Sequence, residues 1–173
     1  MIDEKIKFKE IGIAVVTVSD TRNIENDKSG SYLKKSILNK EHKVRKYEII
    51  KDDLELIQKT IQKLSQDQSI DVIITTGGTG LTGRDNTVDA IKEISEIEIP
   101  GFGELFRYLS YKKIGTSTIQ SRSTAFLMNK KYVFCLPGST SAVRDAWEKI
   151  LYYQLDIRHK PCNFIELIPR LNE

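Results

Sequence analysis

Cysteine, histidine and long apolar segments are scarce in this sequence, and each scarcity excludes a class of protein. Among 173 residues there are two cysteines, Cys135 and Cys162, and two histidines, His42 and His159. No CxxC pair or histidine cluster occurs, so neither a disulfide framework nor a zinc site is indicated. No apolar run approaches the roughly 18 residues of a membrane span, and the N-terminal MIDEKIKFKE lacks a signal peptide's apolar core. The sequence therefore predicts a cytoplasmic protein without a membrane partner.

An excess of charge of one sign is also missing. Lysine and arginine number 27 against 24 acidic residues, which gives a net charge of +3. That charge is too small and too evenly scattered for a nucleic-acid-binding surface. The composition, 39% hydrophobic and 29% charged, is ordinary for a soluble globular protein. We expect a single domain over residues 1–173 with no nucleic-acid partner.

What the sequence does have is a regular alternation of strand-like and helix-like segments. Strands are predicted at Ile11–Val18, Val44–Ile50 and Val72–Thr75. The first and third are almost uninterrupted apolar runs, which is typical of parallel strands covered on both faces. Thr124–Met128 and Tyr132–Leu136 flank a short polar turn and predict a hairpin.

Helix-like segments lie between the strands, and Asp53 is placed to cap one of them. Ile114–Arg122 is polar and predicts a loop, and the tail from Arg158 onward predicts an extended surface segment. The predicted fold is a single-domain α/β three-layer sandwich, with a mostly parallel sheet, one antiparallel strand and helices on both faces. The predicted helices open near Ser29, Leu54, Thr87, Pro100 and Thr140.

The segment Ile70–Ile91, IDVIITTGGTGLTGRDNTVDAI, is the most informative part of the chain. An apolar strand ends in a glycine-rich loop, and a helix opens at about Thr87. Glycines let backbone N–H groups approach an anion, and the helix N-terminus favours negative charge. Asp85 is the unusual member, because a carboxylate beside a phosphate is repulsive unless a cation lies between them. The pattern predicts a phosphate or nucleotide site with a metal-binding carboxylate, and a plain tight turn is the alternative.

Polar loops follow the predicted strands. Because ligands of open α/β sheets bind outside the carboxyl ends of the strands, these loops are expected to meet at one edge and form the site. They are Ser19–Arg22, Lys51–Asp53, the glycine-rich loop through Asp85, and Pro137–Thr140.

Asp52 and Asp85 are the carboxylates that this edge is expected to bring together. Mg²⁺ binds proteins through one or two carboxylates plus substrate phosphates, so the pair favours metal-assisted phosphoryl or nucleotidyl transfer. Position alone leaves other roles open. Asp52 is equally suited to capping the helix that follows, and Asp85 to a contact with Arg84 or the loop backbone.

Hydroxyl and guanidinium groups near the same edge are candidate anion ligands. Ser139 and Thr140 begin a helix, so their hydroxyl and N–H groups suit an anion, although helix capping explains them equally well. Arg122 is a candidate anion clamp, and a solvated surface charge is the alternative.

Motifs along nearly the whole chain carry a family resemblance. They are TVSDTR (17–22), DKSG (27–30), TTGGTGLTGRDNT (75–87), PGFGELFR (100–107), IGTSTIQSR (114–122) and LPGST (136–140). Together they resemble the molybdenum cofactor biosynthesis proteins of the MoaB/MogA type. IGTSTIQSR, PGST and the tail QLDIRHKPCNF are similar to the MoaB branch.

The resemblance implies an α/β protein that assembles as a homotrimer or homohexamer and contacts other enzymes of the pathway. It implies binding of molybdopterin and its adenylylation with ATP and Mg²⁺, with release of pyrophosphate. Catalytic and metal-binding roles fall on Asp85 and Asp52, and Lys51 stands where active relatives often have proline. The implied substrate- and nucleotide-binding residues are Ser19, Asp20, Thr76, Gly77, Gly78, Thr79, Gly80, Ser121, Arg122, Pro137, Gly138, Ser139 and Thr140.

Two functions follow from these expectations. The first is a molybdopterin adenylyltransferase in which Asp85 and Asp52 hold Mg²⁺. The second is a protein that binds molybdopterin or its precursor without chemistry, since some MoaB-branch proteins lack the two acids. This chain keeps both, and a passive phosphate site gains nothing from a nearby carboxylate, which favours the enzyme.

Overall fold

The apolar β-branched segments form neighbouring parallel strands, as their composition predicts. In the computed structural model, which describes residues 1–171, the strand order is β2-β1-β3-β6-β5-β4. Strands β2, β1, β3 and β6 pair in parallel, whereas β5 pairs antiparallel with both β6 and β4. The strands are β1 (Gly12–Val18), β2 (Lys43–Ile50), β3 (Val72–Thr76), β4 (Ile97–Ile99), β5 (Thr124–Met128) and β6 (Lys131–Leu136).

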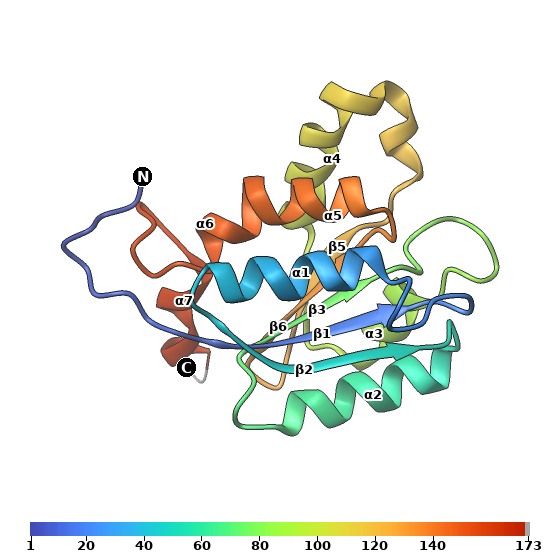
Figure 1. Ribbon diagram of the computed structural model, residues 1–173, viewed down its shortest axis with the longest axis horizontal. Helices are drawn as coiled ribbons and strands as arrows, with labels where there is room; N and C mark the ends of the chain where they lie inside the picture. The colour runs from blue at the N-terminus through green and yellow to red at the C-terminus, as the bar shows by residue number, and fades with distance from the viewer. Residues whose placement is uncertain (172–173) are drawn as a thin grey trace.

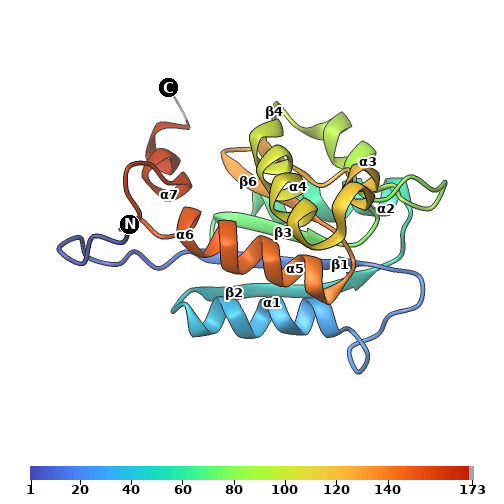
Figure 2. The same cartoon turned by 90° about the horizontal axis from the view of Figure 1, so that it is seen from above.

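Helices cover both faces of the sheet and give the predicted three layers (Figures 1 and 2). On one face lie α1 (Lys28–Asn39) and α5 (Thr140–Ala146), and on the other α2 (Leu54–Gln66) and α3 (Thr87–Ile94). Helix α4 (Pro100–Ile114) rises away from the body with a 3₁₀ helix, Gly115–Gln120, as a projecting arm (Figure 1). The remaining elements are a π-helical turn (Trp147–Leu151), α6 (Tyr152–Gln154), α7 (Phe164–Leu167) and a 3₁₀ turn (Ile168–Arg170).

The sheet separates two apolar cores. In β1, Ile13 and Val15 face the core under α1 and α5, whereas Ala14 and Val16 face the core under α2 and α3. Both sets are fully buried, which explains why this strand reads as a continuous apolar run. Within residues 1–171, no helix is long and apolar enough to cross a membrane.

Three segments differ from the predictions. Strand β4 was not predicted, because its three residues pair only with β5 at the sheet edge. Most of the predicted loop Ile114–Arg122 is a 3₁₀ helix, Gly115–Gln120. The prediction of an extended surface tail was wrong for residues 164–170, which form short helices in which Ile165 is fully buried, whereas residues 158–163 are not helical.

A buried ion pair fastens the C-terminal segment to the end of α1. Lys40 Nζ lies 2.7 Å from Asp156 Oδ2 and 3.6 Å from the ring centroid of Tyr152. Arg158 donates from Nε and Nη2 to the same carboxylate, at 2.9 and 2.8 Å. Burial raises the pKa of Asp156, but hydrogen bonds from Arg158 and Lys40 outweigh that effect and hold the pKa well below its usual range.

We predict that Asp156→Ala lowers the free energy of unfolding at pH 7 by roughly 3–5 kcal/mol, because it leaves Lys40 buried without its carboxylate. Urea unfolding measures the loss. Since the folded-state pKa is depressed, the loss is complete above the unfolded carboxyl pKa of about 4 and shrinks as the pH falls below it. Glu10→Ala, which breaks the exposed pair with Lys43, should change stability by no more than about 1 kcal/mol. Equal losses in both variants would contradict this account.

Candidate functional site

The polar loops that follow β1, β2, β3 and β6 meet at one edge of the sheet, as predicted (Figure 1). Arg22 Nη2 donates to the carbonyl oxygen of Gly138 at 2.7 Å, which joins the loop after β1 to the loop after β6. The backbone N–H of Asp52 donates to Asp20 Oδ1 at 3.2 Å, which joins the loops after β2 and β1. Residues far apart in the sequence therefore share one rim.

The glycine-rich loop has a backbone that other residues adopt with strain. Gly77 and Gly78 have φ angles of 106° and 64°. A Cβ on Gly77 would lie 2.2 Å from the carbonyl oxygen of Val18, so the loop also passes too close to β1 for a side chain. Thr87, the first residue of α3, donates from Oγ1 to Gly77 O at 2.9 Å and from its N–H to Gly78 O at 3.0 Å. The loop is thus fixed between β1 and α3.

Asp52 lies behind this loop and binds Asn86, the residue that precedes α3. Its Oδ1 accepts hydrogen bonds from Asn86 N at 3.1 Å and Asn86 Nδ2 at 3.0 Å, and the residue is 7% exposed. A Cβ on Gly78 would lie 2.9 Å from Asp52 Oδ2. The N-cap of α2 is the neighbouring Asp53, whose side chain accepts a hydrogen bond from Leu56 N. Asp52 therefore does not cap α2, which was the alternative role considered for it.

Asp85 lies against the other end of the same loop, at Gly80. Its Oδ2 accepts from Thr82 N at 2.9 Å and Thr82 Oγ1 at 2.6 Å, and a Cβ on Gly80 would lie 2.7 Å from it. Burial raises the pKa of Asp85, but the hydrogen bonds from Thr82 and from the Gly80 backbone outweigh it and lower the pKa below its usual value. Asp85 is therefore an anion at neutral pH and suited to a cation.

A cavity of about 390 Å³ lies in front of the glycine-rich loop. Eight of the predicted residues line it: Gly77, Gly78, Thr79, Gly80, Asp85, Ser121, Pro137 and Gly138. Ser117 and Gln120 also line it and were not predicted individually. Both belong to IGTSTIQSR, so the signal was the dense row of hydroxyl and amide side chains in a segment expected to be a loop.

The other predicted residues do not line this cavity, namely Ser19, Asp20, Asp52, Thr76, Arg122, Ser139 and Thr140. The guanidinium of Arg122 donates from Nε to Gly80 O at 2.7 Å and from Nη1 to Asp89 at 2.8 Å. Its Nη2 donates to the backbone oxygen of Asp85. Arg122 therefore stabilises the loop from behind, and its expected contact with an anion stays a prediction.

Hydroxyl groups at the rim have structural partners as well. Thr76 Oγ1 donates to the carbonyl oxygen of Pro137 at 2.9 Å. Ser139 caps α5 by accepting from Ala142 N, and Ser19 Oγ accepts from Arg22 N, both at 3.3 Å. The capping alternative for Ser139 is thus observed.

An exposed ion pair stands beside Asp52. Arg84 donates from Nε to Asp20 Oδ2 at 3.1 Å, and its Nη2 contacts the same oxygen. The hydrogen bond from Arg84 lowers the pKa of Asp20. Asp52 and Asp85 therefore lie against the glycine-rich loop, and Asp20 lies beside Asp52 with Arg84 as its partner.

The donor set fits a divalent cation that is shared with a phosphate. Within the described residues, no group of three or more Asp, Glu, His or Cys side chains is arranged to hold a metal ion by itself. Mg²⁺ commonly takes one or two carboxylates and completes its octahedron with water and substrate phosphates. Asp85, in the cavity wall, would be the carboxylate in such an arrangement.

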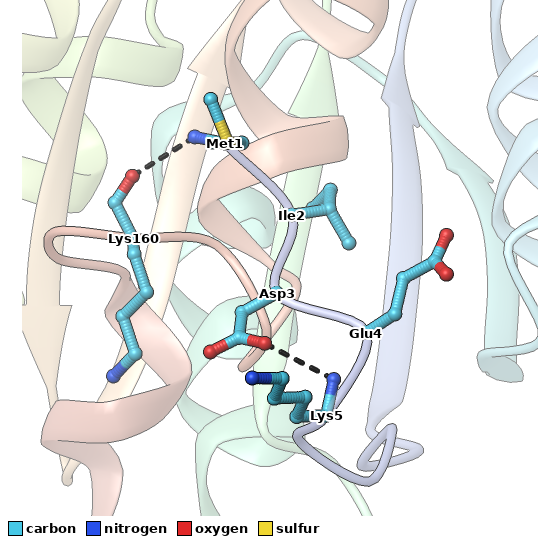
Figure 3. Close-up of a pocket in the computed structure, with 6 residues that line it drawn as sticks. All are labelled: Met1, Ile2, Asp3, Glu4, Lys5 and Lys160. Atoms are coloured by element: carbon cyan, nitrogen blue, oxygen red, sulfur yellow. Dashed lines mark hydrogen bonds between the residues drawn. The ribbon is translucent and has the colours of Figure 1, made fainter.

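A larger hollow of about 620 Å³ lies beside the N-terminus (Figure 3), and the N-terminus is at the end of the molecule opposite these loops (Figure 1). It is lined by Lys160 and residues 1–5. The N-terminal amino group donates to Lys160 O at 3.0 Å, and Lys5 N donates to Asp3 Oδ1 at 3.0 Å. No glycine-rich loop or strand end contributes to it, so the cavity at the glycine-rich loop is the candidate site.

The sequence profile of one protein family matches residues 14–157. The family is described as "Probable molybdopterin binding domain". The chain is 44% identical over 158 residues to molybdenum cofactor biosynthesis protein B of Escherichia coli K12, which covers 91% of this chain and 93% of that protein. It is 45% identical over 148 residues to the protein of the same name from Bacillus cereus, covering 85% and 88% of the two chains.

Solved structures agree with these sequence matches. A crystal structure of a molybdenum cofactor biosynthesis protein B superposes with a TM-score of 0.82 at 44% identity and covers 85% of this chain and 92% of that one. The tungsten cofactor synthesizing protein MoaB from Pyrococcus furiosus superposes with a TM-score of 0.74 at 34% identity, covering 83% and 91%. The relatives thus share the fold over nearly their whole length.

From the geometry of this loop we predict that alanine has different effects on the free energy of unfolding at Gly78 and at Gly83. Gly78→Ala should lower the free energy of unfolding by at least about 1–3 kcal/mol, because of the positive φ and because the new Cβ would lie 2.2 Å from Thr87 Oγ1. Gly83→Ala is the matched control, since its Cβ meets nothing within 4 Å. It should leave stability within about 1 kcal/mol. Urea unfolding of both variants measures the difference, and a harmless Gly78→Ala would refute the described loop geometry.

Proposed function

The chain belongs to the molybdopterin-binding family of molybdenum cofactor biosynthesis proteins, and from this membership we propose that it binds molybdopterin and adenylylates it with ATP. The observation that carries the proposal is the ionised carboxylate of Asp85 in the wall of a cavity otherwise lined by uncharged residues, mostly glycines and hydroxyl-bearing side chains. A site that only held a phosphate would be weakened by that charge. The carboxylate is useful where a cation joins it to the phosphates of a nucleotide.

The proposed reaction is a nucleotidyl transfer. An oxygen of the pterin's terminal phosphate attacks the α-phosphorus of ATP and forms a new P–O bond. The bond between the α-phosphorus and the oxygen that bridges to the β-phosphorus breaks, and its electrons leave with pyrophosphate. Bound Mg²⁺ would offset the negative charge that grows on the transferring and leaving phosphate oxygens.

The chain's own residues bind and orient the reactants in this proposal. The backbone N–H groups of Gly78 and Thr79 approach phosphate oxygens, because the N–H of Gly77 donates to Leu136 O at 3.0 Å and the backbone of Gly80 is hydrogen-bonded to Asp85. Ser117, Gln120 and Ser121 supply hydroxyl and amide groups from the 3₁₀ helix side. Asp85 holds the cation, and Asp52 fixes the loop and the start of α3 through Asn86.

The alternative function is molybdopterin binding without chemistry. One observation favours it: Asp52 is buried and hydrogen-bonded to Asn86, so only one of the two expected catalytic carboxylates lines the cavity. A transfer enzyme with a single carboxylate at the metal remains compatible with Mg²⁺ chemistry.

Assembly as a homotrimer or homohexamer is part of the proposal. The arm formed by α4 and the 3₁₀ helix exposes large apolar side chains, namely Leu105, Tyr108, Tyr111, Ile114 and Ile119. Exposed apolar side chains that gather in this way are typical of protein interfaces. Light scattering of the purified protein measures the assembly.

Incubation of the purified protein with molybdopterin, Mg²⁺ and α-labelled ATP tests the reaction. We expect label in the pterin product and stoichiometric pyrophosphate. Asp85→Asn should lower the rate of adenylyl transfer about 10²-fold or more, because the amide no longer holds the cation, while pterin binding persists. The amide keeps an oxygen that accepts from Thr82.

Glu93→Gln is a control with the same loss of charge, because Glu93 lies on the outer side of α3 and pairs with Gln58. It should transfer label at the wild-type rate. Pterin binding without any labelled product in the wild type would establish the carrier function instead. Undiminished transfer by Asp85→Asn would remove the proposed role of that carboxylate.

A further inference from the structure

The arginines around the candidate site differ in what holds them. Arg122 donates to the carbonyl oxygen of Gly80, and Arg107 to those of Ser121 and Ser123. Arg22 donates to Gly138 O at 2.7 Å and pairs with the buried Asp27. Each of these guanidinium groups fixes the backbone of a loop, so moving it to a ligand would leave carbonyl oxygens without donors.

Arg84 is held differently. It lies in the exposed loop that carries Asp85, and its side chain is 68% exposed. Within residues 1–171, the acceptor of its guanidinium is the carboxylate of Asp20. Asp20 keeps its hydrogen bond from Asp52 N when Arg84 leaves, so no buried group loses a partner.

The energies favour an exchange of partners. An exposed ion pair of this kind stabilises a protein little, because water solvates both charges and salt screens their attraction. Bidentate hydrogen bonds between a guanidinium and phosphate oxygens are among the stronger polar contacts, because both groups are charged and their geometries match. An incoming phosphate therefore competes well with Asp20 for Arg84.

We propose that Arg84 is an anion-binding residue that exchanges Asp20 for the diphosphate portion of the nucleotide. Its neighbour Asp85 lines the cavity, so the guanidinium starts one residue from the site. The exchange adds a positive charge where the pyrophosphate leaves, and it frees the Asp20 carboxylate beside Asp52. The identity of the anion as a diphosphate rests on the proposed adenylyl transfer; the exchange itself rests on the ion pair.

A purely structural ion pair makes a different prediction. If Arg84 and Asp20 only tie two loops together, removing either partner loosens the same contact and weakens anion binding. If they exchange, the two changes act in opposite directions, because Asp20 competes with the anion for Arg84. Binding of inorganic pyrophosphate distinguishes these cases without any need for catalysis.

Isothermal titration calorimetry with inorganic pyrophosphate in EDTA, repeated with Mg²⁺, is the test. Arg84→Gln should weaken binding about tenfold or more, the scale of losing a charged hydrogen-bond donor. Asp20→Asn should strengthen it about two- to fivefold, the scale of releasing an exposed ion pair. In the double variant the gain from Asp20→Asn should disappear, because no guanidinium is left to release.

Charge-matched controls come from the exposed pair of Lys43 and Glu10, in which Lys43 begins β2 at the opposite end of the strand. Lys43→Gln and Glu10→Gln should leave pyrophosphate affinity within about twofold of the wild type. The proposal is overturned if the wild type binds no pyrophosphate, if Arg84→Gln and Asp20→Asn both weaken binding, or if the gain from Asp20→Asn survives in the double variant. A gain that persists in the double variant would mean that Asp20→Asn strengthens pyrophosphate binding only by removing a negative charge, and not by releasing Arg84.

The adenylylation assay is a separate readout. If the wild type forms no adenylylated pterin, but Arg84→Gln and Asp20→Asn change pyrophosphate affinity in opposite directions, the exchange stands and the proposed reaction is refuted. If the wild type adenylylates the pterin but Arg84→Gln binds pyrophosphate as tightly as the wild type, the proposed reaction stands and the exchange is refuted.

Discussion

The site depends on how the glycine-rich loop is held between carboxylates and guanidinium groups. Gly77 and Gly78 take positive φ angles, and Thr87 at the start of α3 donates to both of their carbonyl oxygens. Asp52 secures Asn86 behind the loop, and Arg122 donates to its far end at Gly80. These contacts fix the loop closely against β1, α3 and Asp85, where a side chain at Gly77, Gly78 or Gly80 would clash, and so hold the wall of the cavity in place.

The polar side chains near the cavity divide into those that build it and those that are available to a ligand. Thr76, Arg122 and Ser139 would each be assigned to substrate from chemistry alone, yet each has a backbone partner. Asp85 also accepts hydrogen bonds from Thr82, but its charged side chain lines the cavity, and Arg84 is exposed with Asp20 as its partner. A fixed cradle with charged side chains at its rim suits a reaction whose phosphate charges change during each turnover.

The sequence predicted the fold wherever local pattern and long-range structure agree. Uninterrupted apolar runs predicted β1 and β3, because both faces of a central parallel strand are buried. Strand β4 escaped prediction because three residues carry too little pattern, and their pairing with β5 is set by the tertiary structure. The helical tail was missed for a similar reason, since Ile165 is buried by contacts that its neighbours in sequence do not reveal. In the site, the gathering of loops was predictable from strand ends, whereas the partner of Arg122 was not, because residue type does not reveal where a guanidinium points.

The central claim is that a divalent cation binds between Asp85 and the phosphates of a nucleotide at the glycine-rich loop. Crystals grown with Mn²⁺ and a non-hydrolysable ATP analogue test it directly, because anomalous scattering locates the metal. The account predicts a manganese peak in contact with the Asp85 carboxylate and with phosphate oxygens of the analogue. A nucleotide bound at the loop with its metal away from Asp85, or bound elsewhere on the molecule, would contradict it.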